Sequence, residues 1–260
     1  MKKYIITGLV SLTAIFSSCD DQLFQTPFQS IDQSLALNSD ANVKSVLIGA
    51  YGEIRSTALY GGRLQLYAEM LGSNGEIRWE GTFNQPREMY NKQIFVNNSF
   101  VEGTWAAAYR AINVSNNVLS ALDVVNEEDR DRIEGEARFI RGSMYFELVK
   151  LFAQPYSAGN TSANLGVPLV LTPTRGITEE SFVARNTVEE VYQLIVNDLE
   201  RAESILPASN GFFARNYVVA AQLSRVYLQM GRYAEARDAA DRAISVATSN
   251  GKTLVPNYMD

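Results

Sequence analysis

Residues 218–247 read VVAAQLSRVYLQMGRYAEARDAADRAISVA and predict two short helices joined by a tight turn. In the first helix, apolar residues recur three or four positions apart and so share one face: Val219, Leu223, Val226 and Met230. Gly231 supplies a residue that readily adopts the left-handed conformation that ends helices. The second helix carries a stripe of mostly small side chains: Tyr233, Ala236, Ala240, Ala243 and Ala247. Because alanines let a neighbouring helix approach closely, we expect this stripe to be packed against another helix.

The hairpin resembles one tetratricopeptide repeat. Ser224 stands three residues before Tyr227, Gly231 follows four residues after it, and the second helix has an alanine face. A plain helical hairpin has the same periodicity, so the spacing leaves both interpretations open. One hairpin cannot bury its apolar face alone, so the rest of the chain should supply neighbouring helices.

Other stretches with helical periodicity are found along the whole chain. They are residues 40–54, capped by Asp40, then 64–71, 104–122, 127–152 and a helix whose apolar face runs from Val188 to Ala202. The last of these opens with a capping box made by Thr187 and Glu190 and stops before Pro207. The predicted fold class is therefore all-α, with degenerate tetratricopeptide-type hairpins and long irregular loop insertions.

The largest aromatic-rich insertion is the segment Gly72 to Ser99, where the periodicity is lost. Polar residues alternate there with aromatic ones, namely Trp79, Phe83, Tyr90 and Phe95. Long irregular segments inside compact domains are usually functional or disordered, and the aromatic residues argue against disorder. One interpretation is a binding loop in which Trp79 stacks on a flat ligand face while Asn74 and Arg78 contact hydroxyl groups. In the other, the rings only hold the loop against the helices.

Composition excludes several function classes. The 260 residues have a net charge of −6 without a basic patch, which argues against nucleic acid as a partner. The chain has no histidine, the usual general base and the commonest metal ligand, and only one cysteine. No motif selects a pair of carboxylates among the 29 acidic residues, so the sequence predicts no catalytic residues, no metal site and no cofactor.

The single cysteine follows a short export signal. Lys2 and Lys3 precede an apolar run, residues 4–16, that is shorter than the about 20 residues of a membrane span. Ser17 and Ser18 then stand directly before Cys19, as at a bacterial lipoprotein processing site. We therefore expect residues 1–18 to be a lipoprotein signal peptide, Cys19 to be lipidated, and residues 19–38 to be a tether. A simple secretory signal with an incidental cysteine is the alternative.

Several motifs together resemble the SusD/RagB outer-membrane lipoproteins of Bacteroidetes. They are Trp105-x3-Tyr109-x2-Ile112-x3-Asn116, then residues 135–141 (GEARFIR), Tyr145-Phe146-x-Leu148 and Pro155, and later residues 188–192 (VEEVY), Asp198-Leu199-x2-Ala202, Leu206-Pro207 and the segment from Ala220 to the Gly231 hairpin. The resemblance covers essentially the whole chain. Two positions depart from the family pattern: Ala153 replaces a usual glycine, and Asn74 replaces a usual aspartate in the loop.

The resemblance implies a SusD-like helical protein, lipid-anchored on the outer membrane and facing the cell exterior. Such proteins bind glycan, or in some relatives peptide, and deliver it to a TonB-dependent (SusC-like) transporter without doing chemistry. Asp20 and Asp21, after the lipid cysteine, resemble the family's surface-export signal. Members are typically about twice as long, so residues 39–260 are expected to form the N-terminal part of the fold, truncated at the C-terminus.

Two other functions remain as alternatives. A protein- or peptide-binding repeat adaptor without sugar binding accounts for the hairpins but gives the aromatic loop no role. A secreted glycosidase would need two carboxylates facing each other across a cleft.

Overall fold

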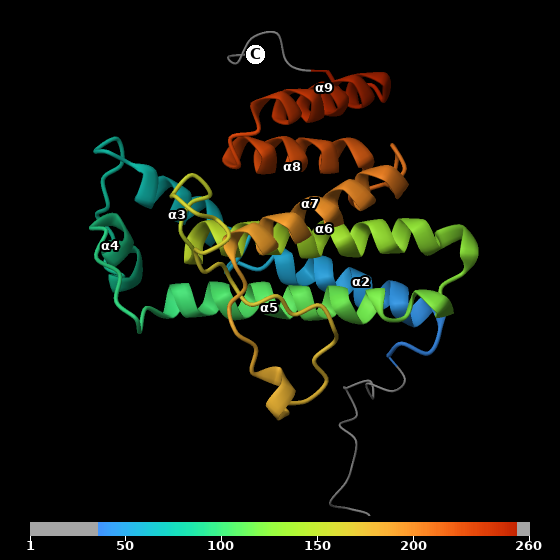
Figure 1. The fold of residues 1–260 in the computed structure, drawn as a ribbon, viewed down its shortest axis with the longest axis horizontal. Coiled ribbons are helices and arrows are strands. Elements are labelled where there is room, and N and C mark those ends of the chain that lie inside the picture. Colours follow the sequence, from blue (N-terminus) through green and yellow to red (C-terminus); the bar gives the residue numbers. More distant parts are fainter. Residues whose placement is uncertain (1–35, 254–260) are drawn as a thin grey trace, which may run out of the picture. The chain divides into compact units, whose positions relative to one another are not determined.

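The computed structural model describes residues 36–253, in which eight α-helices follow one another without a sheet (Figure 1). They are α2 (Asp40–Ile54), α3 (Arg63–Gly72), α4 (Asn84–Tyr90), α5 (Ser99–Leu119), α6 (Glu127–Phe152), α7 (Val188–Ile205), α8 (Asn216–Gln229) and α9 (Tyr233–Ser249). The all-α prediction is thereby confirmed. Leu37–Asp260 is one of two units of the chain and is described by itself. The predicted signal peptide, Cys19 and most of the tether lie outside the described residues.

The long helices pack largely in chain order. α2 lies against α5 and α6, α6 also packs on α5 and α7, and α8 lies between α7 and α9 (Figure 1). The apolar stripes predicted for α6 and α7 form the centre of this stack. The fully buried residues there are Ile133, Ala137, Ile140, Met144 and Leu148 on α6, and Val188, Val191, Ile195, Leu199 and Ala202 on α7.

Small residues set how closely α6 and α7 approach. A Cβ atom added to Gly142 would lie 3.2 Å from Leu199 Cγ and 3.3 Å from Asp198 Cβ. The glycine therefore lets α7 lie close to α6 at this point. Tyr145 itself is fully buried.

The first helix of the α8–α9 hairpin is followed by a glycine in the left-handed conformation, as predicted. Gly231 has φ +74°, and the Arg232 amide donates to the Tyr227 carbonyl at 2.9 Å, which closes the helix end. The buried stripe of α9 differs from the predicted one, because Ala239 is fully buried, Ala240 is only half-buried and Tyr233 is 70% exposed. The predicted stripe was wrong in part because α9 has alanines on several faces, so small residues alone do not identify its buried face.

Two local boundaries differ from the predictions, and a third agrees with its prediction. α2 is capped by Ser39, whose hydroxyl accepts from the Asn42 amide at 3.4 Å, while Asp40 is its first residue. α5 begins at Ser99 rather than Thr104 and is capped by the Asn98 side chain. The predicted capping box of Thr187 and Glu190 is confirmed at the start of α7.

The long connection between α6 and α7 contains only the short 3-10 helix η3 (Glu179–Ser181) and one isolated bridge, from Leu165 to Thr187. Its first part is held by Arg185, whose guanidinium donates to the carbonyls of Gly166 and Phe152 at 2.6 and 2.9 Å. A second short 3-10 helix, η2 (Leu122–Val124), joins α5 to α6.

Candidate functional site

The aromatic loop between α3 and α5 is partly helical. Residues 84–90 form α4, which the aperiodic reading of Gly72 to Ser99 missed. Pro86 is the third residue of this helix, where a proline is tolerated because its missing N–H has no partner within the helix in any case. Asn98 fixes the end of the loop by donating from its amide group to Glu88 Oε2 at 2.7 Å.

Trp79 lies against a small apolar cluster of its own. The cluster is centred on Tyr67, Met70 and Met89, and the half-buried indole packs on it. A Cβ atom on Gly81 would lie 2.2 Å from the ring, so the chain turns tightly over the indole. The indole N–H is buried and has no hydrogen-bond acceptor within the described residues.

Asn74 and Arg78 lie on the exposed side of the loop. The Asn74 backbone amide donates to Glu76 Oε2 at 2.6 Å, and its side chain is open to solvent. The Arg78 side chain is 83% exposed and forms an ion pair with Glu80 at 2.9 Å. Over residues 36–253, no hydrogen bond or ion pair joins Asn74, Arg78 and Trp79 to one another. The structure thus places the three residues in one loop without a hydrogen bond or ion pair between them.

Further apolar surface lies beside these residues. Phe83 and Phe95 are 66% and 63% exposed. An apolar hollow of about 200 Å³ is lined by residues of α3, α4, α5, α6 and the connecting loop: Tyr67, Leu71, Met89, Ile94, Val101, Leu151 and Phe152. The loop therefore combines exposed rings, polar donors and a hollow, which is the composition of a ligand-binding surface.

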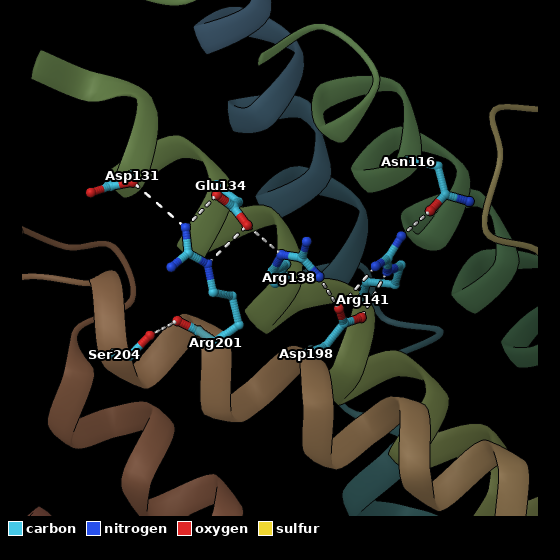
Figure 2. A network of polar contacts seen from close by, with 8 residues as sticks. All are labelled: Asn116, Asp131, Glu134, Arg138, Arg141, Asp198, Arg201 and Ser204. Atoms are coloured by element: carbon cyan, nitrogen blue, oxygen red, sulfur yellow. Dashed lines mark hydrogen bonds and ion pairs between the residues drawn. The ribbon is translucent and has the colours of Figure 1, made fainter. Parts of the chain in front are cut away.

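A buried ion pair connects α6 to α7 (Figure 2). The carboxylate of Asp198 accepts from Arg141 Nε at 2.7 Å, from Arg141 Nη2 at 2.8 Å and from Arg138 Nη1 at 2.8 Å. The side chains of Asp198 and Arg141 are 1% and 8% exposed. Such a pair, satisfied by several charge-assisted bonds, fixes both partners in position.

The same arginine orients a side chain that holds the α6–α7 connection. Arg141 Nη1 donates to Asn116 Oδ1 at 2.9 Å, and Asn116 Nδ2 donates to the Val170 carbonyl at 2.8 Å. The Tyr145 hydroxyl donates to the same carbonyl at 3.0 Å and accepts from the Val170 amide at 2.7 Å. Burial raises the pKa of Tyr145 to about 12, so the hydroxyl keeps its proton at neutral pH. Asn113 continues the series by bonding both the amide and the carbonyl of Thr174.

The sequence contained one signal for this network. Asn116 interrupts an otherwise apolar stripe, and a buried polar residue needs a partner. The partners lie 25 residues away (Arg141) and 54 residues away (Val170) in the sequence. Helical periodicity does not reveal which distant residues those are.

At the exposed end of the network, Glu134 bridges Arg138 and Arg201 (Figure 2). The hydrogen bonds from Arg201, with those from Arg138, hold the pKa of Glu134 below its ordinary value of 4.5. A carboxylate with a lowered folded-state pKa stabilises the fold above its unfolded-state pKa, and this contribution is lost as the pH falls through the folded-state pKa.

We therefore expect Glu134→Gln to be less stable than the wild type at pH 7, and the difference to vanish as the pH falls below about 4.5. Urea unfolding of both proteins between pH 7 and pH 3 measures this difference in the free energy of unfolding. Glu69→Gln is the control, because Glu69 is exposed and forms no ion pair within residues 36–253. A Glu134→Gln difference that stays constant with pH would contradict the assignment.

Two other kinds of site are absent from residues 36–253. No group of three or more His, Cys, Asp or Glu side chains is arranged to hold a metal ion. In the same residues, no helix is both long and apolar enough to cross a membrane.

Comparison with known proteins gives a consistent group of relatives. The protein-family model SusD-like_3, described as "Starch-binding associating with outer membrane", matches residues 26–228. SusD-like protein P2 of Formosa agariphila is 25% identical over 266 residues, covering 100% of this chain and 50% of the relative. SusD-like protein P25 of the same organism is 23% identical over 271 residues, covering 97% and 48%. The chain thus spans about half the length of the curated relatives it matches.

Solved structures with a similar fold belong to the same group of proteins. A putative sugar binding protein from Bacteroides vulgatus superposes with a TM-score of 0.72 at 30% identity, covering 83% of this chain and 48% of that chain. A SusD superfamily protein from Bacteroides fragilis gives 0.71 at 28% identity, covering 80% and 50%. A laminarin-binding SusD-like protein shares the fold, with a TM-score of 0.67 at 22% identity over 85% of this chain and 47% of that one.

Proposed function

The chain belongs to the SusD-like family, described as starch-binding and associating with the outer membrane, and from this premise we propose that it captures oligosaccharide at the cell surface. The observation that carries the proposal is the loop of residues 73–98, where exposed rings and polar donors adjoin an apolar hollow. Sugar rings have one face of C–H groups that covers an aromatic ring, and hydroxyl groups that accept from amide and guanidinium groups. The family description names binding and membrane association, which supports a binding protein rather than an enzyme.

Within this loop, the proposed ligand-binding residues are Trp79, Asn74 and Arg78. Trp79 would present the uncovered part of its ring to the sugar, with Asn74 and Arg78 donating to hydroxyl groups. Because the indole also packs on Tyr67, Met70 and Met89, Trp79 contributes to stability as well. The experiment must therefore measure binding per folded molecule.

Trp79→Ala is expected to weaken binding of the best oligosaccharide of a panel by roughly two- to tenfold, since an aromatic contact contributes about 0.5–1.5 kcal/mol. Isothermal titration calorimetry at a temperature where both proteins are folded measures the loss, with malto-oligosaccharides and laminarin oligosaccharides as probes. Trp79→Phe is the matched variant, which keeps a ring and should keep part of the affinity. Should Trp79→Ala melt earlier yet bind normally, the indole only holds the loop.

We further propose that Cys19 carries lipid, that the protein faces the cell exterior from the outer membrane, and that it passes its ligand to a TonB-dependent transporter. These proposals rest on the family and on the short export signal before Cys19. In this proposal the lipid chains attach the protein to the membrane, because each buried methylene contributes about 0.8 kcal/mol.

Labelled palmitate is expected to be incorporated by the wild type and lost in Cys19→Ala. The measurement is radiolabel on the purified protein after growth in an outer-membrane-bearing host. Ser17→Ala is the control, because alanine is also small and should preserve processing. Equal labelling of the wild type and Cys19→Ala would rule out this anchor.

A peptide- or protein-binding adaptor is the second candidate function. It is favoured by an apolar hollow of about 320 Å³ on the α8–α9 hairpin, lined by residues that include Val218, Ala221 and Ile244. Binding of the oligosaccharide panel above would favour the first function, and its complete failure would favour the second.

A further inference from the structure

A third hollow, about 350 Å³ in volume, lies at the end of α2 and is formed by no residue of the 73–98 loop. That volume falls in the range of about 300–1,000 Å³ that is typical of small-molecule sites. Aromatic side chains dominate its lining: Tyr51, Ile54, Arg55, Tyr60, Gly61, Phe212 and Phe213. Neither Phe212 nor Phe213 belongs to a periodic segment of the sequence, so nothing in the pattern indicated them.

Phe212 is presented to solvent by a turn that is held on several sides. Its relative exposure is 105%, the value of a fully open side chain. Gly211 has φ +53°, and the Asn210 amide group donates to the Ala214 carbonyl at 2.9 Å. The Ala214 amide donates to the Tyr51 hydroxyl at 3.0 Å, which joins the turn to α2. Among residues 36–253, nothing covers this apolar ring, so it offers an exposed contact surface on a fixed turn.

The ring next to it is already in an aromatic pair. The centroids of Phe213 and Tyr51 are 5.1 Å apart, with an interplanar angle of 56°. The lining also includes Tyr60, whose hydroxyl donates to Glu147 Oε1 at 3.2 Å. These rings are fixed before any ligand arrives, so they offer flat faces at little cost in conformational entropy.

The charges around the hollow are unbalanced. Arg55 lines it, is exposed, and forms no ion pair within residues 36–253. Arg225 on α8 also forms no ion pair within residues 36–253. It lies near Tyr60, where its positive charge partly offsets the rise in the pKa of the Tyr60 hydroxyl that burial causes.

Three carboxylates on α2 and α6 are engaged by other cations. Glu53 pairs with Arg110, Glu136 with Arg132 and Glu147 with Lys150. The hollow therefore joins aromatic faces to an unneutralised positive charge, in a chain whose net charge is −6.

We propose that this hollow binds an acidic sugar residue, a pyranose that bears a carboxylate or a sulfate. The apolar face of the sugar packs on Phe212 and its neighbours, and the anionic group accepts hydrogen bonds from Arg55, with Arg225 adding to the field. An arginine fork matches the planar geometry of a carboxylate and also binds the oxygens of a sulfate. The inference rests on the proposed glycan function but concerns a separate surface.

The test is calorimetry of the full chain with three tetrasaccharides: oligogalacturonate, a sulfated carrageenan fragment and neutral maltotetraose. Binding of at least one acidic probe is expected, weakening as salt rises. Arg55→Gln should reduce it by roughly tenfold or more, as for loss of a charge-assisted hydrogen bond, and Arg55→Lys should retain part of it. Phe212→Ala should also weaken it without changing the melting temperature, because this ring is fully exposed.

Two controls separate this inference from the proposed function. Phe95→Ala removes an exposed ring from the other loop and should leave acidic-sugar binding unchanged. Trp79→Ala should affect the neutral probe and not the acidic ones. If neither acidic probe binds, or if Arg55→Gln and Phe212→Ala bind like the wild type, the inference is wrong whatever the neutral sugar does. Equal competition by a tetraglutamate peptide would assign the hollow to an acidic polypeptide and overturn it as well.

Discussion

Asp198→Asn is expected to lower the free energy of unfolding by about 3–5 kcal/mol, the usual cost of breaking a buried ion pair. The shape of the side chain is kept, but the charge that balances Arg141 is lost. Arg141 is 8% exposed, so its guanidinium would stay largely out of water without its carboxylate. Urea denaturation at pH 7 measures the difference.

Two comparisons make this result specific. Asp238→Asn breaks the ion pair of Arg237 and Asp238, whose side chains are 70% and 55% exposed, and should cost far less because water already solvates both charges. Replacing the pair with Arg141→Met and Asp198→Leu removes both charges. The double variant should be more stable than Asp198→Asn, because no uncompensated buried charge remains. A double variant less stable than Asp198→Asn would show that the pair's hydrogen bonds outweigh the burial of its charge.

The effect should reach beyond the helices. Without Asp198, Arg141 no longer holds Asn116 in the orientation that donates to Val170. Backbone amides between Val170 and Thr174 are therefore expected to exchange with solvent faster in Asp198→Asn, relative to those at the centre of α7. Unchanged exchange there would mean that Tyr145 and Asn113 suffice to hold the segment.

Local signals predicted the central helices well, for a physical reason. The stripes of α6 and α7 follow from helical periodicity, and the capping box of Thr187 and Glu190 involves residues three positions apart. Such features depend on neighbours in the sequence, so the sequence displays them directly. α4 was missed because seven residues are too few to establish a period.

The sites were less accessible to prediction, because they depend on contacts between distant segments. Arg141 and Asp198 are 57 residues apart, and the aromatic pair of Tyr51 and Phe213 joins α2 to the turn before α8. Trp79 was predicted to lie in a loop and does, but its packing on residues of α3 and α4 could be read only from the structure. Residue types indicated that binding surfaces exist, and the fold decided which side chains share one.

Leu199→Ala is expected to cost about 2–5 kcal/mol, because a fully buried leucine is replaced by a cavity between α6 and α7. The size of that loss depends on how far the helices close the space. Gly142 provides a way to probe it, since a methyl group placed there would point at Leu199 Cγ, 3.2 Å away.

In the wild type, Gly142→Ala gains helix propensity of about 1 kcal/mol but meets Leu199 at a tight contact that offsets the gain. In the Leu199→Ala background the same methyl group enters the cavity, so its benefit should exceed that in the wild type by about 0.8 kcal/mol, the contribution of one buried methylene. Gly49→Ala on α2, where an added Cβ meets nothing within 4 Å, measures the propensity gain alone and should be equal in both backgrounds. If Gly142→Ala gains equally in both, α7 has moved to fill the space, and the separation of the two helices is set by the side chains rather than by the glycine.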